Sequence, residues 1–189
     1  LIKKINVIDK KKTIISDSRP LLKSGKRVSV GYLLDLMITR SDNTAANCLI
    51  DLLTREKINR FIRRHSWKGS EVTRKFLPRE LEEKIYRKVP MTMTSTRHIA
   101  EFLYLVETRQ LINKKLLGRQ LDKSKIRKVL PKSASFFHKT GWFDYIKDKK
   151  KIGVSGDCGI VEDGNTKYVI ACIVMFPERK GSKILKIVG

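Results

Sequence analysis

The sequence predicts an α+β fold in which a mainly helical region, residues 29–130, is combined with an antiparallel sheet. Two observations support this prediction. Between positions 29 and 130 apolar residues recur at three- and four-residue spacing, as they do on one face of a helix. After Pro131 the apolar residues fall into short extended runs, which are typical of strands. Residues 1–28 and 131–189 are therefore assigned to the sheet.

The first half of the helical region contains three predicted helices. Ser29 is a suitable N-cap for the first, which places Leu33 and Leu36 on one face. The second begins near Thr44, and the third follows Thr54. Each has apolar residues at helical spacing, so each is expected to bury one face.

The second half of the helical region is less regular. Residues 68–89 show no clean period and are predicted to be mostly loop. A hydroxyl within residues 94–96 is expected to cap a helix that buries Leu103. Short helices over residues 113–130 are predicted to stop at Pro131.

Three strands are predicted in the C-terminal region, over residues 135–142, 153–162 and 167–176. A two-residue turn at Gly164-Asn165 would join the last two as a hairpin. In that register Cys158 lies opposite Ala171, and Cys172 points to the other face. The three cysteines form no C-x-x-C pair, so buried free thiols are expected rather than a disulfide framework.

The two ends of the chain give shorter patterns. Residues 5–8 and 13–15 are predicted to form brief strands, and residues 178–189 resemble the opening of a helix that is cut short. The chain starts at Leu1 rather than Met, so we expect the gene product to begin further upstream.

The composition narrows the class of protein. Hydrophobic residues make up 41% of the chain, which is enough for a core and excludes wholesale disorder. No apolar run approaches the roughly 18 residues needed to span a bilayer. The 42 basic and 19 acidic residues give a net charge of +23, which attracts polyanions. Two explanations of this charge stay open. Either it forms an anion-binding surface, or the basic residues are simply solvated and reflect a bias in codon usage toward lysine. Because no RNA-binding signature is present, no specific nucleic acid is expected.

Two short motifs point to a chemistry. The first is Ser41-Asp42-Asn43, which continues as Thr-Ala-Ala-Asn, and the second is Lys139-Thr140-Gly141. S-D-N and K-T-G, together with S-x-x-K, are signatures of class A β-lactamases and penicillin-binding proteins. Over residues 28–177 the chain resembles the class A β-lactamase-like branch of this serine hydrolase superfamily. The resemblance implies a β-lactamase/transpeptidase-like fold whose N-terminal part is missing.

The resemblance implies catalytic roles for two residues of the first motif. Ser41 carries a hydroxyl that can donate and accept a proton at once during acyl transfer. Asn43 carries an amide that can hold a substrate carbonyl and a neighbouring lysine. Asp42 is expected to brace its own turn. Capping of the following helix is the alternative explanation for Ser41 and Asn43.

The second motif supplies the remaining expected site residues. Lys139 is the third catalytic residue, because its charge suits a substrate carboxylate, and the Thr140 hydroxyl adds to that contact. Gly141 and Trp142 complete the substrate-binding set, with the backbone N–H of Trp142 as an oxyanion-hole donor. The alternative is that Lys139 is one more surface lysine.

The chain departs from the family pattern in three places. No serine is followed by a lysine three positions later, so the nucleophile is expected upstream and the chain alone is expected not to react with penicillin. In Phe76-Leu77-Pro78, a leucine stands where class A enzymes carry the deacylating glutamate. Trp142 is bulky where classical β-lactamases carry a small residue.

The resemblance therefore implies a serine acyl-enzyme hydrolase that acts on a β-lactam or a peptidoglycan peptide. No cofactor or metal is expected, because His65, His98 and His138 are far apart in sequence. A periplasmic or secreted location and contact with an anionic cell-envelope surface are implied as well. Two alternatives stay open: a non-catalytic module that keeps the groove, and a basic protein that binds anions or nucleic acid.

Overall fold

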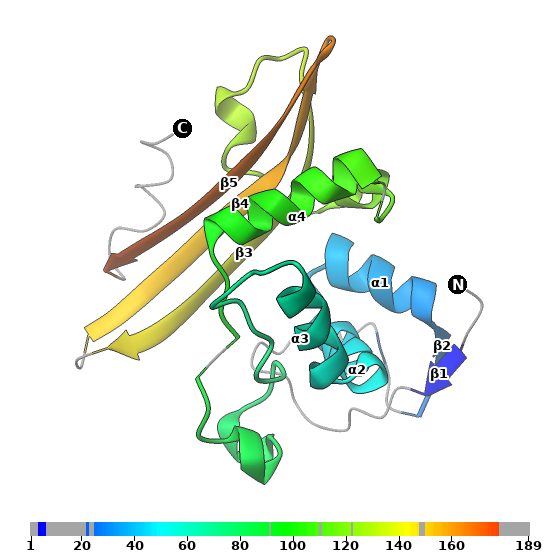
Figure 1. The fold of residues 1–189 in the computed structure, drawn as a ribbon, viewed down its shortest axis with the longest axis vertical. Helices are drawn as coiled ribbons and strands as arrows, with labels where there is room; N and C mark the ends of the chain where they lie inside the picture. The colour runs from blue at the N-terminus through cyan, green and yellow to red at the C-terminus, as the bar shows by residue number, and fades with distance from the viewer. Residues whose placement is uncertain are drawn as a thin grey trace. The chain divides into compact units, whose positions relative to one another are not determined.

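A computed structural model describes the structure of residues 4–6, 22, 25–90, 92–109, 111–121, 123–147 and 150–177. The chain forms two compact units, Leu1–Ser95 and Thr96–Gly189, and each is described by itself (Figure 1). The predicted strand at residues 13–15 and the predicted helix at residues 178–189 lie outside the described residues. No helix among the described residues is long and apolar enough to cross a membrane.

The first unit is built on three consecutive helices. Its regular elements are β1 (Lys4–Asn6), β2 (Arg27–Ser29), α1 (Val30–Thr39), α2 (Asn43–Leu53) and α3 (Arg55–Arg64). The predicted cap of α1 is confirmed, because the Ser29 hydroxyl accepts a hydrogen bond of 3.1 Å from the backbone N–H of Tyr32. The core contains Leu22, Leu33, Leu36, Ala45, Cys48 and Leu49. The apolar residues of α1 and α2 therefore pack into one common core, as their spacing predicted.

The segment after α3 is mostly irregular, as expected from its lack of period. It contains two short 3-10 helices, η1 (Arg79–Leu81) and η2 (Lys84–Tyr86). An isolated β-bridge between Glu71 and Met93 closes it. The segment is therefore a loop whose two ends are hydrogen-bonded to each other.

The second unit places a helix on an antiparallel sheet (Figure 1). Its elements are α4 (Thr96–Arg109), η3 (Lys114–Arg119), η4 (Arg127–Val129), β3 (Ser135–Lys147), β4 (Lys150–Asp163) and β5 (Thr166–Pro177). The strand order is β3-β4-β5. Helix α4 packs against β4 and β5 and buries Leu103 and Val106. Ile160 and Val161, on opposite faces of the central strand, are both fully buried.

The predicted hairpin turn is confirmed, and all three strands are longer than expected. Asp163 pairs with Thr166, so Gly164-Asn165 is the two-residue turn, and Gly164 has the positive φ of 58° that such a turn favours. The first strand was predicted to end at residue 142 but pairs with β4 as far as residue 147.

The cysteines are free thiols, as expected. Cys48 and Cys158 are buried and Cys172 is half-buried. Cys158 lies opposite Ala171, which confirms the predicted register. Burial raises the pKa of the Cys158 thiol to about 11, so this sulfur stays protonated and unreactive at neutral pH.

Candidate functional site

The S-D-N motif forms the corner between α1 and α2. Ser41 is exposed and has a φ of 55°, a left-handed conformation that costs a non-glycine residue energy and is common at functional sites. The Asp42 carboxylate is the N-cap of α2 and accepts a 2.7 Å hydrogen bond from the backbone N–H of Ala45. Asp42 therefore braces the turn, as expected. The N-cap of α2 is thus Asp42 rather than Ser41 or Asn43.

The K-T-G motif lies on β3, which has a strand neighbour on one side only within the described sheet. Lys139 and Gly141 point to one face, and Thr140 and Trp142 to the other, because side chains alternate along a strand. Lys139 is half-buried, and its ammonium donates to the carbonyl oxygen of Thr140 at 2.6 Å. The Trp142 side chain is 62% exposed. A side chain at Gly141 would meet nothing within 4 Å, so the strand is open at this point.

The predicted site residues thus fall into two local groups. Ser41 and Asn43 share the corner of the first unit, and residues 139–142 share one strand of the second.

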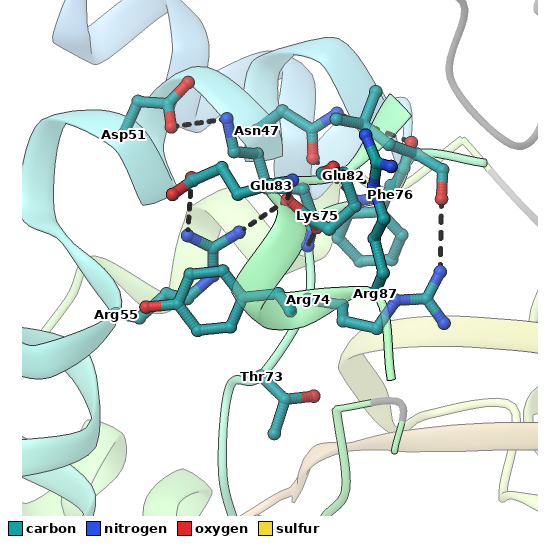
Figure 2. Close-up of polar contacts among 12 residues, drawn as sticks. Asn47, Asp51, Arg55, Thr73, Arg74, Lys75, Phe76, Glu82, Glu83 and Arg87 are labelled. Carbon is teal, nitrogen blue, oxygen red and sulfur yellow. Dashed lines mark hydrogen bonds and ion pairs between the residues drawn. The ribbon is translucent and has the colours of Figure 1, made fainter. Parts of the chain in front are cut away.

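Asn47 clamps α2 to the loop that follows α3, a contact that neither motif predicts. Asn47 is polar, yet it is fully buried among the apolar residues of α2. Its side-chain oxygen accepts from the backbone N–H of Phe76 at 2.8 Å, and its Nδ2 donates to the Phe76 carbonyl at 3.4 Å (Figure 2). The clamp holds the residue directly before Leu77, which is 2% exposed. A polar residue on the buried face of a helix was the signal that could have found it.

Asn47→Ala is expected to lower the free energy of unfolding by about 1–3 kcal/mol, because the N–H of Phe76 loses its buried acceptor. Hydrogen exchange at the Phe76 amide should accelerate. Asn59 makes an equivalent pair of bonds to the backbone of Val72, so Asn59→Ala is a matched control. Asn59→Ala should accelerate exchange at Val72 and leave Phe76 protected. Equal exchange at Phe76 in both variants would contradict a local clamp.

A buried ion pair fastens the same loop to α3. The Glu82 carboxylate accepts from Arg55 at 2.9 Å and from the backbone N–H of Lys75 at 2.7 Å (Figure 2). Arg55 also bonds Glu83 at 3.1 Å and stacks over the Tyr86 ring at 3.7 Å. Burial alone would raise the pKa of Glu82, but the backbone N–H donors and Arg55 outweigh it and lower that pKa.

A second buried carboxylate braces the strand that carries the K-T-G motif. Asp157 on β4 accepts from His138 Nδ1 at 3.0 Å and from the Ser124 hydroxyl at 2.6 Å. It also accepts from the backbone N–H groups of Lys125 at 2.8 Å and Ile126 at 3.2 Å. Burial alone would raise the pKa of Asp157. The hydrogen bonds that its carboxylate accepts, above all the one from His138, outweigh burial, so the pKa lies below its usual value. His138 is thus a structural residue, as expected, and fixes β3 immediately before Lys139.

Within the described part of the chain, no group of three or more His, Cys, Asp or Glu side chains is arranged to hold a metal ion. The side chains of Ser41, Asn43 and Lys139 supply a hydroxyl, an amide and an ammonium group.

Comparison with protein families gives the family. The model of the beta-lactamase enzyme family, Beta-lactamase2, matches residues 3–187. The chain belongs to this family. The β-lactamase family assignment agrees with the motifs and with the superfamily predicted from them. The comparison with curated proteins gave no match.

Solved structures confirm the β-lactamase/transpeptidase-like fold. PBP-A is similar with a TM-score of 0.76 and 20% identity, over 100% of this chain and 69% of that chain. A leucine-to-glutamate mutant of PBP-A, in an acyl-enzyme complex with penicillin G, gives a TM-score of 0.75 at 20% identity over the same shares. A class A β-lactamase from Mycobacterium abscessus gives 0.68 at 21% identity, over 100% of this chain and 74% of that chain.

Proposed function

We propose that this β-lactamase family chain is part of a serine acyl-enzyme hydrolase that opens amide bonds of β-lactams or peptidoglycan peptides. The nucleophilic serine lies in sequence upstream of Leu1. The observation that supports the proposal most is the corner at Ser41, where Asp42 caps the helix and Ser41 itself is an exposed residue in a left-handed conformation. Family membership supplies the reaction class.

In this proposal the corner carries the proton. The lysine of the upstream S-x-x-K motif takes the proton of the nucleophilic hydroxyl as its oxygen bonds to the substrate carbonyl carbon, and the carbon–nitrogen bond then breaks. The Ser41 hydroxyl passes a proton to the departing nitrogen and receives one from the neighbouring lysine in return. The Asn43 amide holds the substrate carbonyl through its N–H and that lysine through its oxygen.

Strand β3 carries the groups that bind the substrate in this proposal. Although the two side chains leave β3 on opposite faces, the Lys139 ammonium reaches the Thr140 carbonyl at 2.6 Å, and in this proposal it binds the substrate carboxylate together with the Thr140 hydroxyl, a charge-assisted contact. The Trp142 N–H is one donor of the oxyanion hole, and Gly141 leaves room beside the strand. The proposal requires the corner and this strand to face each other across one cleft.

Leu77 makes the protein resemble a penicillin-binding protein more than an antibiotic-destroying enzyme. Its side chain is buried and has no group that can activate a water molecule. An acyl-enzyme formed at this site would therefore hydrolyse slowly.

Leu77→Glu is expected to shorten the lifetime of the penicillin acyl-enzyme by about 100-fold, because it adds a general base. The lifetime is measured on the full gene product as the loss of a fluorescent penicillin label with time. Leu77→Gln is the matched control, since it has similar size but no base, and it should keep the long lifetime. Equal lifetimes in the two variants would show that residue 77 does not reach the acyl bond.

Labelling with fluorescent penicillin tests the site directly. The full gene product should be labelled at an upstream serine, located by mass spectrometry, while residues 1–189 alone stay unlabelled. Ser41→Ala and Lys139→Ala should each slow labelling by about 100-fold, because they remove proton transfer and carboxylate binding. Ser66 is also exposed with a positive φ, so Ser66→Ala is the control and should label normally. A labelled serine within residues 1–189 would contradict the proposal.

The same experiment separates the alternative, a non-catalytic module that keeps the groove. Such a module would have no S-x-x-K upstream and would bind penicillin reversibly without a covalent label. We also propose a periplasmic or secreted location, since that is where peptidoglycan peptides occur.

A further inference from the structure

Basic residues are concentrated on one helix of the first unit. Helices α1 and α2 contain no Lys or Arg, whereas five of the ten residues of α3 are basic. A coding bias toward lysine would spread the charge evenly, and four of these five residues are Arg. The uneven distribution therefore needs a local cause.

Three of these cations share one exposed face. Lys57, Arg60 and Arg64 follow helical spacing, span about 10 Å along the axis, and are called here the basic face of α3. Phe61 lies between them and is 41% exposed. None of the three side chains has a hydrogen-bond or ion-pair partner among the described residues. The nearest acid on the helix, Glu56, receives the Tyr86 hydroxyl at 3.3 Å.

The fold itself explains only part of this charge. Arg55 belongs to the buried pair with Glu82, and Arg63 and Arg64 complement the negative C-terminal end of the helix dipole. Lys57 lies in the first turn, where the positive end of the dipole disfavours a cation. Its charge, and that of Arg60, are therefore not explained by helix stability.

We propose that the basic face of α3 binds a linear polymer that carries phosphodiester groups, of the kind found in a cell envelope. This choice of ligand rests on the proposed function, because a hydrolase of peptidoglycan peptides works among such polymers. Phosphate is favoured over carboxylate since two of the three cations are Arg, whose planar fork binds phosphate oxygens bidentately.

Two other anionic partners fit this face less well. A membrane surface would require a broad apolar stripe beside the cations, and Phe61 is the one apolar side chain on the basic face. A single strand of nucleic acid would require several aromatic rings for stacking. A hollow of about 480 Å³ opens near the end of α3, but its lining combines Glu71 with Arg63 and Lys68, so its charge is mixed, whereas the charged side chains of the basic face of α3 are all positive. The phosphates are therefore assigned to the helix face.

The test uses the full gene product and poly(glycerol phosphate) as the probe, with binding measured across a salt series. A triple variant, Lys57→Gln, Arg60→Gln and Arg64→Gln, should weaken binding by about tenfold or more. The slope of log affinity against log salt should fall by about 2–3, one counterion for each lost contact. The matched control replaces three exposed lysines of the second unit by Gln, at positions 115, 128 and 132. This control should retain most of the affinity.

Three results would overturn the proposal: equal weakening in the control, tighter binding to single-stranded DNA of equal phosphate number, or tighter binding to phosphatidylglycerol vesicles. Thermal unfolding of both variants shows whether the fold is retained. Penicillin labelling should be unchanged in the triple variant. If the parent is not labelled but polymer binding depends on α3, then the proposed hydrolase function fails and the surface assignment stands.

Discussion

Glu82→Ala is expected to lower the free energy of unfolding by about 3 kcal/mol, because it removes the buried partner of Arg55 and leaves that buried charge paired only with the exposed Glu83. The backbone N–H of Lys75 loses its acceptor at the same time. Chemical denaturation monitored by circular dichroism measures the change. Hydrogen exchange should show the largest loss of protection in the loop after α3.

Glu83 provides the matched control for this prediction. Its carboxylate also bonds Arg55, but the side chain is 56% exposed, so Glu83→Ala should cost less than about 1 kcal/mol. If the two variants were equally stable, the buried position of Glu82 would not be what makes its ion pair important.

Asp157→Ala is the second variant with a large expected effect, a loss of about 3–5 kcal/mol. The substitution removes the acceptor of four groups. These are the Ser124 hydroxyl, the His138 ring and the backbone N–H groups of Lys125 and Ile126. Exchange at these two amides should accelerate most. Asp163→Ala is the control, since Asp163 accepts one exposed bond from Ser133 and should cost less than about 1 kcal/mol. Unchanged exchange at residues 125 and 126 would contradict the account.

Both carboxylates also set the pH dependence of stability. The pKa values of Glu82 and Asp157 are lower in the folded chain than in the unfolded one. Their contribution is therefore complete above the unfolded values, about 4, and is lost as the pH falls through the folded values. The Glu82→Ala and Asp157→Ala variants should consequently lose less stability on acidification than the parent.

The sequence predicted the features that depend on neighbouring residues. The Ser29 cap and the Gly164-Asn165 turn are determined within a few positions, because a hydroxyl or a flexible residue acts on the nearest backbone. The S-D-N corner is equally local, since Asp42 caps its own helix.

The contacts that position the loop and β3 could not be predicted in the same way. Asn47 reaches Phe76, and Arg55 reaches Glu82, across nearly thirty residues of chain. Asp157 joins His138 to a loop further upstream. Such pairs depend on how the chain returns on itself, and one sequence shows no spacing that specifies the return.

A crystal structure of the full gene product acylated by penicillin tests the central claim most directly. We predict that the penicillin carboxylate lies within hydrogen-bond distance of Lys139 and Thr140 while the Ser41 hydroxyl and the Asn43 amide approach the opened ring from the other side. A structure in which the corner and the strand do not border the same bound molecule would contradict the account.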